Sequence, residues 1–222
     1  MLKTLFLDLD GTLLDSEPLW RQAPIRLLCS KDFLVPEYIL NHQDELDMRG
    51  SIRAIMQDEA LWSKLGMTYE ECEQWCFDNM TKLYHTTLEL KPNAQELVRF
   101  AKEQGLNVMI VTATEEKNAR KICERFGLTA CVDLIHSTFG KPVKKSSADL
   151  FHALMEQVNC SPEECVLLDD AMYAHQGAKA AGCQAWAIWD PIRKLVWSEI
   201  CAGADAHFND LSEVQQRIAE LL

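Results

Sequence analysis

Short apolar runs and helically spaced apolar positions alternate along most of the chain. The apolar runs predict β-strands over 3–9, 107–111, 131–135, 165–168 and 185–189. The helically spaced segments predict helices over 94–103, 115–126, 149–158, 174–181 and 212–221. Strands that alternate with helices favour a mostly parallel sheet with helices on both faces. We therefore predict an α/β fold, a Rossmann-like doubly wound parallel sheet.

The alternation is interrupted between the first predicted strand and Pro92. There the apolar positions keep helical spacing, as at Ile52 and Ile55, and no convincing strand pattern intervenes. This pattern predicts a helical insertion in the α/β fold. The predicted boundaries are a core domain of residues 1–15 and 88–222 and a helical domain of residues 16–87.

Composition narrows the function classes. The chain has 222 residues, with 22 Lys and Arg against 34 Asp and Glu, so its formal charge is −12. This acidity disfavours nucleic acid and anionic membrane surfaces as partners. No stretch approaches the ~20 apolar residues of a membrane span, and the N-terminal segment lacks the uninterrupted apolar run of a signal peptide. We expect a cytoplasmic protein, a monomer or small homo-oligomer, whose cysteines are reduced.

Carboxylates follow two of the predicted strands at their carboxyl ends, where ligands bind in sheets of this class. Asp8 and Asp10 lie on the same side of the extended chain, and Gly11 permits a sharp turn after them. Asp169 and Asp170 follow another predicted strand. Carboxylates that lie so close repel one another unless a cation lies between them or one of them holds a proton. A site rich in hard oxygen atoms suits Mg²⁺.

Groups suited to a phosphate lie near two further strand ends. Thr112 and Ala113 come directly before a predicted helix, where a hydroxyl and backbone N–H groups favour an anion. The segment 137–148 has no acidic residue and three lysines, Lys141, Lys144 and Lys145. A carboxylate nucleophile, a metal ion, a hydroxyl and a lysine are the parts that phosphoryl transfer requires.

These motifs in this order resemble the haloacid dehalogenase-like hydrolase superfamily over nearly the whole chain. Asp-x-Asp-Gly-Thr at 8–12 matches its first motif, Thr112 its second, Lys145 its third and Asp169-Asp170 its fourth. The helical insertion is similar to the α-helical cap of the subgroup that contains β-phosphoglucomutase and phosphoglycolate phosphatase.

The resemblance implies a Mg²⁺-dependent phosphatase that acts on a small phosphorylated metabolite, such as a sugar phosphate. It implies that Asp8 attacks phosphorus to form a phospho-aspartate, and that Asp10 protonates the leaving group and later activates water. The implied Mg²⁺ ligands are Asp8, the Asp10 carbonyl and Asp170. Asp169 is either a further direct ligand or a carboxylate that contacts one of the ligands. The residues implied to hold the phosphoryl oxygens are Thr112, Ala113 and Lys145.

The third motif leaves an alternative open. Lys141-Pro142 has the dipeptide usual in this motif, but it comes too early relative to Asp149, so helix phase favours Lys145. Thr114 is expected to be the N-cap of the helix 115–126. The histidines show no metal-ligand spacing and are interpreted as structural or exposed.

Substrate recognition and the exact reaction also stay open. Gly50-Ser51-Ile52-Arg53 is similar to the G-x-x-R stretch of phosphosugar-binding caps, so Arg53 is a candidate for a substrate's distal anion. Arg49 is a second candidate, and the alternative is a surface arginine on a helix 51–65. Two rival functions are a phosphosugar mutase that uses the same phospho-Asp8 and a non-catalytic member that binds a phospho-ligand or a protein.

Overall fold

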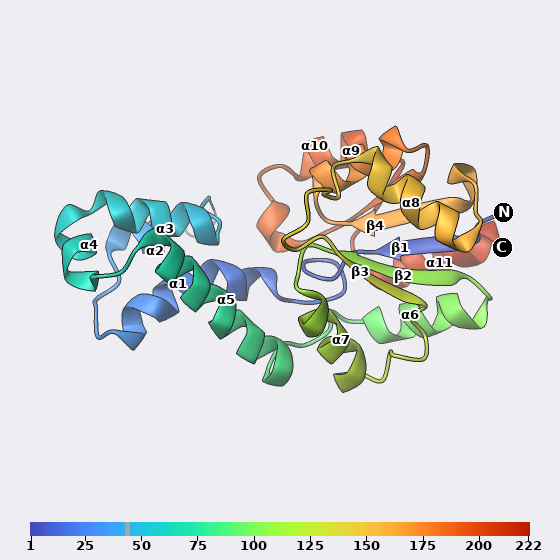
Figure 1. Ribbon diagram of the computed structural model, residues 1–222. Helices are drawn as coiled ribbons and strands as arrows, with labels where there is room; N and C mark the ends of the chain where they lie inside the picture. Colours follow the sequence, from blue (N-terminus) through green and yellow to red (C-terminus); the bar gives the residue numbers. More distant parts are fainter. Residues whose placement is uncertain (43–44) are drawn as a thin grey trace. The chain divides into compact units, whose positions relative to one another are not determined.

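The structure, a computed structural model, describes residues 1–42 and 45–222. The chain divides into two compact units, whose elements are labelled in Figure 1. Met1–Asp15 and Glu89–Leu222 form the core unit, and Ser16–Leu88 form the helical unit. The chain therefore passes from one unit to the other twice, after Asp15 and after Leu88.

The core unit is built on a parallel sheet with the strand order β3-β2-β1-β4-β5-β6. Every residue of the central strand β1 is buried, as is usual for parallel strands covered on both faces. The predicted Rossmann-like, doubly wound α/β class is confirmed. The strands are β1 (Thr4–Leu7), β2 (Asn107–Thr112), β3 (Leu134–Ser137), β4 (Cys165–Asp169), β5 (Gln184–Ile188) and β6 (Ala206–Phe208).

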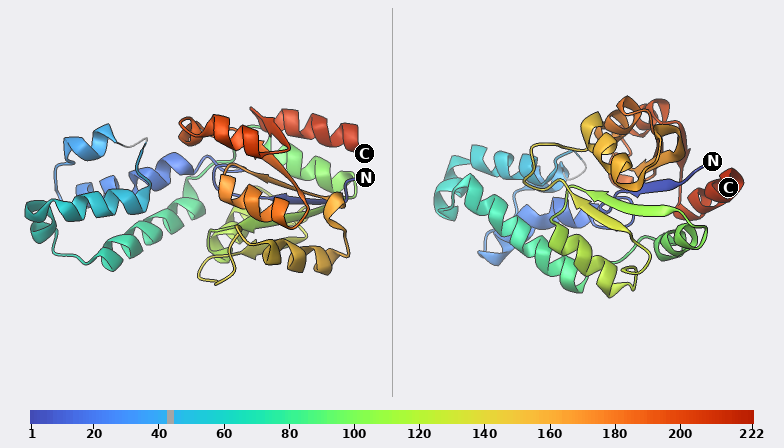
Figure 2. Two further views of the ribbon diagram at one scale, coloured as in Figure 1. Left: turned by 90° about the horizontal axis from the view of Figure 1, so that it is seen from above. Right: turned by 45° about the vertical axis from the view of Figure 1, so that its right-hand side comes forward.

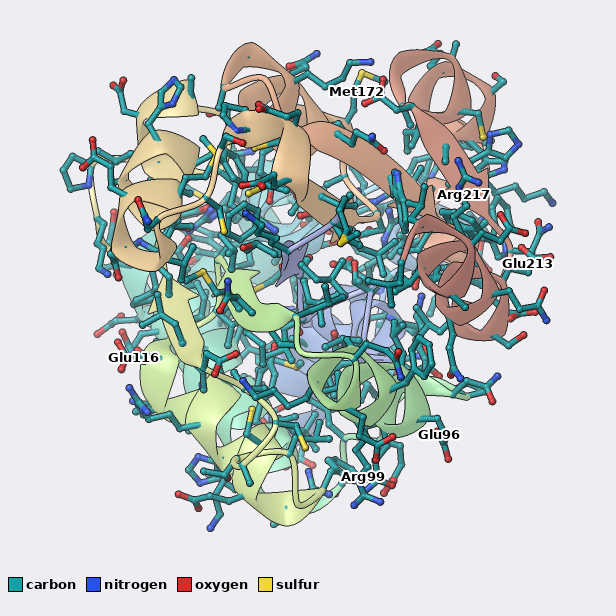
Figure 3. The ribbon with its side chains drawn as sticks, turned by 90° about the vertical axis from the view of Figure 1, so that its right-hand side faces the viewer. Glu96, Arg99, Glu116, Met172, Glu213 and Arg217 are labelled. Atoms are coloured by element: carbon teal, nitrogen blue, oxygen red, sulfur yellow. The ribbon has the colours of Figure 1, made fainter. Side chains whose placement is uncertain are left out.

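Helices cover both faces of this sheet. α8, α9 and α10 lie on one side of it and α6, α7 and α11 on the other (Figure 1). Charged side chains of α6 and α11, among them Arg99 and Arg217, lie on the outer surface of the core unit (Figure 3). The helices are α6 (Ala94–Glu103), α7 (Glu116–Arg125), α8 (Ala148–Val158), α9 (Met172–Ala180), α10 (Trp197–Gly203) and α11 (Leu211–Leu221).

The interior between the sheet and helices α8 and α9 is apolar. Phe6 of β1 meets Phe151 of α8 edge to face, with ring centroids 5.7 Å apart. Small residues of α9, such as Ala174 and Ala178, let that helix approach β4 and β5. The two chain termini lie side by side at one end of the core unit (Figure 2). Because β1 starts there, the carboxyl ends of the strands lie at the opposite edge.

The helical unit has α-helices and no strand in its described residues. Side chains cap three of its helices: Asp47 accepts from the Gly50 amide, Asp58 accepts from the Leu61 amide, and Thr68 forms a capping box. Helices α1, α3 and α5 pack against one another. The helices are α1 (Glu17–Ser30), α2 (Glu37–Asn41), α3 (Met48–Gln57), α4 (Glu59–Leu65) and α5 (Tyr69–Thr86).

Several predicted boundaries differ from the structure. The third strand is β3 rather than 131–135, because the Cys131 amide closes a turn on Leu128, and pairing starts only after Asp133 accepts from the Val108 amide. A single helix over 51–65 is wrong because Asp58 ends α3 and caps α4.

The remaining differences between the predicted and the observed elements concern short helices and strands. The pattern did not predict the seven-residue helix α10 or the three-residue strand β6. Ser161 forms a capping box with Glu164, and the 3-10 turn Pro162–Glu164 that it caps comes directly before β4. None of the helices in the described residues is both long and apolar enough to span a membrane.

Candidate active site

The loop after β1 brings Asp8 to the carboxyl edge of the sheet. Leu7 pairs with Leu168 of β4, so the next residues of the two strands, Asp8 and Asp169, are neighbours. The Asp8 amide donates to the Leu168 carbonyl at 3.0 Å, which extends the strand ladder by one bond. The Asp8 side chain is therefore held at a fixed point of the sheet edge, with 4% of its surface exposed.

Gly11 makes the tight turn that follows possible. Its φ is +76°, in the left-handed region that favours glycine. A Cβ at this position would lie 2.8 Å from the Asp170 carboxylate. The absent side chain thus allows the loop after β1 to lie directly against the loop after β4.

Three carboxylates converge at this edge. Oxygen atoms of Asp8, Asp169 and Asp170 lie within 4.8 Å of one another, and all three residues are buried. Asp169 Oδ1 also accepts from the Ala171 amide at 2.8 Å, which orients its other oxygen. Carboxylates packed this closely are stabilised by a nearby cation or by a proton on one of them.

Lys145 is one such cation. Its Nζ lies 2.7 Å from Asp8 Oδ1 and 2.8 Å from Asp169 Oδ2. The Tyr173 ring lies beside it, with its centroid 5.7 Å from Nζ. Lys145 is 2% exposed, whereas Lys141, the alternative from the third motif, is exposed. The structure therefore brings Lys145, and not Lys141, to the carboxylates.

A second glycine lets the Lys145 loop reach this position. A Cβ on Gly177 of α9 would lie 2.0 Å from the Lys145 carbonyl oxygen. Only a residue without a side chain fits between this helix and the loop. The sequence offers a glycine here but no local signal of what it contacts.

The buried charges shift one another's pKa values. Burial raises the pKa of Asp8 well above its usual range, and the charge of Asp169 adds to the rise while Lys145 opposes it. Burial also raises the pKa of Asp170, against the effect of Arg193. Burial lowers the pKa of Lys145, but the charges of Asp169 and Asp8 outweigh it, so that pKa rises well above its usual value. The lysine is therefore a fixed cation.

Arg193 is a site residue that the sequence reasoning missed. Its Nε lies 2.7 Å from Asp170 Oδ2. It follows the strand β5, so the rule that ligands bind beyond the carboxyl ends of parallel strands also applies to its loop. The predicted strand 185–189 carries this signal, and the residues that follow it include Arg193.

The loop after β2 holds Asp10. Thr112 is fully buried, and its Oγ1 accepts from the Thr114 amide at 3.1 Å. The Thr114 hydroxyl donates to Asp10 Oδ2 at 2.5 Å. The prediction that Thr114 is the N-cap of α7 is therefore wrong. The Thr114 hydroxyl is hydrogen-bonded to a carboxylate in another loop, and Glu115 is the N-cap residue.

The two arginine candidates belong to the helical unit. Both lie on α3. Arg49 Nε lies 2.6 Å from Glu73 Oε1, and its guanidinium lies 6.0 Å from the centre of the Phe77 ring. Arg53 is exposed. Both side chains therefore lie at or near the surface of this unit.

Comparisons with known proteins identify the family of the chain. The family model for haloacid dehalogenase-like hydrolases matches residues 2–182. Hexitol phosphatase B of Escherichia coli K12 is 26% identical over 177 residues, which are 78% of this chain and 78% of that protein. A phosphorylated carbohydrates phosphatase of Thermotoga maritima is 24% identical over 185 residues, 82% of this chain and 83% of that protein.

A solved structure supports the same assignment at the level of the fold. A Thermotoga maritima protein provisionally assigned as a β-phosphoglucomutase matches over 100% of both chains, with a TM-score of 0.79 and 22% identity. The family model spans most of the chain, and the resemblance drawn from the motifs is thereby confirmed. The chain belongs to the haloacid dehalogenase-like hydrolase family and is a hydrolase.

Proposed function

We propose that the protein is a Mg²⁺-dependent phosphatase that hydrolyses a small phosphorylated metabolite through a phospho-aspartate on Asp8. The observation that carries this proposal is the group of three buried carboxylates with Lys145 bound to two of them. A nucleophile, a cation site and a fixed lysine within one buried cluster are suited to phosphoryl transfer. The curated relatives named above are phosphatases of phosphorylated compounds, which supports the same substrate class.

The residues present fit Mg²⁺. Asp8, Asp169 and Asp170 offer hard carboxylate oxygens within 4.8 Å of one another. Among the described residues, Lys145 and Arg193 contact these carboxylates, so two formal positive charges face three formal negative ones. Asp8 and Asp170 would hold the ion, with Asp169 as a third ligand or as the partner that fixes Lys145. When bound, the ion would neutralise charge on the phosphoryl oxygens.

Asp8 is the nucleophile in this proposal. One carboxylate oxygen of Asp8 forms a bond to phosphorus while the bond from phosphorus to the leaving oxygen breaks. Lys145 orients the Asp8 carboxylate through its contact with Oδ1. Because Lys145 and Asp8 are buried, the attacking group has little contact with bulk water.

Asp10 moves the proton. It donates a proton to the leaving oxygen in the first step, and in the second step it accepts a proton from the water that attacks the phospho-aspartate. The Thr114 hydroxyl, which donates to Asp10 Oδ2, holds the carboxyl group in place for both transfers. Thr112 and the Ala113 amide, together with Lys145, would bind the remaining phosphoryl oxygens.

The helical unit is the proposed source of substrate selection, as a cap whose hinges lie near residues 13–17 and 86–91. Arg49 and Arg53 are the candidate contacts to a second anionic group of the substrate. Closure of such a unit would exclude water during the transfer.

A substrate panel tests the proposal. Purified protein with Mg²⁺ is assayed for phosphate release from sugar, hexitol and short organic-acid phosphates, with Asp8→Asn as the control. We expect release from at least one sugar or hexitol phosphate, and its loss with Asp8→Asn or after chelation of Mg²⁺. An assay with β-glucose 1-phosphate and a bisphosphate activator distinguishes a mutase. Activity that survives Asp8→Asn would refute the mechanism.

A further inference from the structure

Lys91 lies where three loops of the core unit meet, although no motif selects it. Its Nζ donates to the Gly11 carbonyl at 2.5 Å and to the Trp189 carbonyl at 3.3 Å. The same Nζ lies 2.7 Å from Asp190 Oδ2. The side chain of Lys91 is 13% exposed and that of Asp190 is 1% exposed. An ammonium group with three oxygen partners in this setting is held in one place.

Through Gly11, Lys91 acts on the loop that carries the first motif. The Gly11 carbonyl belongs to the peptide between Gly11 and Thr12, one residue after Asp10. The Lys91 backbone also takes part, because its amide donates to the Leu13 carbonyl at 2.8 Å. Gly11 has φ +76°, and its amide donates to the Leu14 carbonyl at 3.1 Å. Lys91 thus holds this turn by both its side chain and its main chain.

Through Asp190, Lys91 acts on the loop that carries Arg193. Asp190 Oδ1 accepts from the Ile192 amide at 3.0 Å and so caps the short turn Pro191–Arg193. Arg193 then reaches Asp170 Oδ2 at 2.7 Å. One lysine therefore connects the loop of Asp10 with the loop of the arginine that contacts Asp170.

We propose that Lys91 is a positioning residue for the reaction, acting through the Gly11 carbonyl on Asp10 and through Asp190 on Arg193. The expected effect on kcat rests on the proposed function. The expected effect on the order of the two loops does not depend on it. Lys91 touches no reacting atom. It keeps the turn that follows Asp10 and the turn that carries Arg193 in one arrangement, so its loss relaxes both.

Three variants separate positioning from mere stability. Lys91→Met leaves Asp190 buried without its cation, which destabilises the fold whatever the role of the lysine. Asp190→Asn keeps the Lys91 contact with Gly11. The double variant Lys91→Met/Asp190→Asn removes the contact with Gly11 and leaves no unpaired charge, so we expect it to melt close to the wild type.

Hydrogen exchange of the whole protein gives a readout that needs no substrate. We expect the peptide covering residues 8–14 to exchange about tenfold faster in the double variant, and at nearly the wild-type rate in Asp190→Asn. Exchange in α11 serves as the internal reference and stays unchanged. Unchanged exchange over 8–14 in the double variant would overturn the proposal. Equal acceleration in Asp190→Asn would also overturn it, because that variant keeps the contact with Gly11.

Kinetics supply the second readout. In the double variant kcat is expected to fall about tenfold or more, with KM within about threefold of the wild type, because the acid–base group is misplaced while substrate contacts remain. A wild-type kcat in a double variant that lacks the lysine would overturn the proposal. If the wild-type protein releases no phosphate from any substrate, the proposed function fails, and hydrogen exchange still decides the role of Lys91.

Discussion

The core unit and the helical unit present their candidate functional residues in opposite ways. In the core unit, Asp8, Lys145 and Asp170 have exposed fractions of 4%, 2% and 1%. Lys145 contacts Asp8, and Asp170 contacts Arg193. In the helical unit, Arg49 has a side chain that is 53% exposed, and Arg53 is exposed. The core charges are costly to bury and are therefore tightly paired, whereas surface charges can change with little effect on stability.

This difference in exposure indicates which unit determines the reaction and which determines the choice of substrate. In our proposal, the chemistry depends on a cluster of charged residues that the order of the strands brings together. Substrate choice, in our proposal, depends on side chains that the fold leaves adjustable. Substitutions in the two units should therefore differ in kind: loss of kcat and stability in the core unit, and changes of KM in the helical unit.

The largest effect is expected for Lys145→Met. We expect kcat to fall by about 10²–10³, because a fixed positive charge at the reacting group is removed. Asp8 and Asp169 also lose their cation, so the metal-free protein should lose about 3–5 kcal/mol of unfolding free energy. Phosphate-release kinetics and denaturant titration measure the two effects. Lys141→Met, in the same loop, is the matched control and should change neither. Equal effects of the two substitutions would contradict the assignment of Lys145.

Gly177→Ala tests whether the lysine loop depends on α9. The new Cβ would lie 2.0 Å from the Lys145 carbonyl, so the loop or the helix has to move. We expect a loss of about 1–3 kcal/mol of unfolding free energy together with a loss of kcat. Gly203→Ala is the control, because no described residue outside its own helix and its chain neighbours lies within 4 Å of its Cβ position. A Gly177→Ala protein with wild-type kcat would show that the site does not depend on this contact.

The arginines of the helical unit should give smaller, substrate-dependent effects. Once a substrate is known, Arg49→Ala or Arg53→Ala is expected to raise KM about tenfold, or ~1.4 kcal/mol, for a substrate with a second anionic group. kcat should stay close to that of the wild type. Arg120→Ala in the core unit, whose guanidinium pairs on the surface with Glu116, is the reference. If neither variant changes KM, the proposed role of these arginines is wrong.

The smallest expected effect concerns the reactivity of the cysteine thiols, which tests the packing of the helical unit. Burial raises the pKa of Cys72 to about 11 and that of Cys76 to about 12. Less than about one per cent of either thiol is then ionised at pH 8.5, since each pH unit below the pKa lowers the thiolate fraction tenfold. Cys29 is exposed and should be alkylated first, as mass spectrometry of digested peptides would show. Rapid alkylation of Cys76 in the folded protein would contradict the observed packing of α1 and α5.

The sequence predicts much of the core unit because its signals are local. The buried strand β1 followed by Asp8, Asp10 and Gly11 can be recognised within one short segment. The same holds for β4 followed by Asp169 and Asp170. In each case the strand pattern and the polar residues are adjacent in the chain.

The parts that the sequence did not predict depend on contacts between distant segments. Thr114 has a hydroxyl suited to an N-cap and comes directly before a predicted helix, but that hydroxyl donates to Asp10. Lys91 has no neighbouring pattern that links it to Gly11 and Asp190. Strand order and loop packing determine these contacts, and no local periodicity encodes them.

The central claim is that Asp8 carries the phosphoryl group during turnover. The most direct measurement is acid quenching of the protein during reaction with a substrate radiolabelled in its phosphate, followed by digestion and identification of the labelled peptide. We predict that the label is on the peptide containing Asp8 and that Asp8→Asn protein carries none. Phosphate release without label on that peptide, or equal labelling of Asp8→Asn protein, would contradict the account.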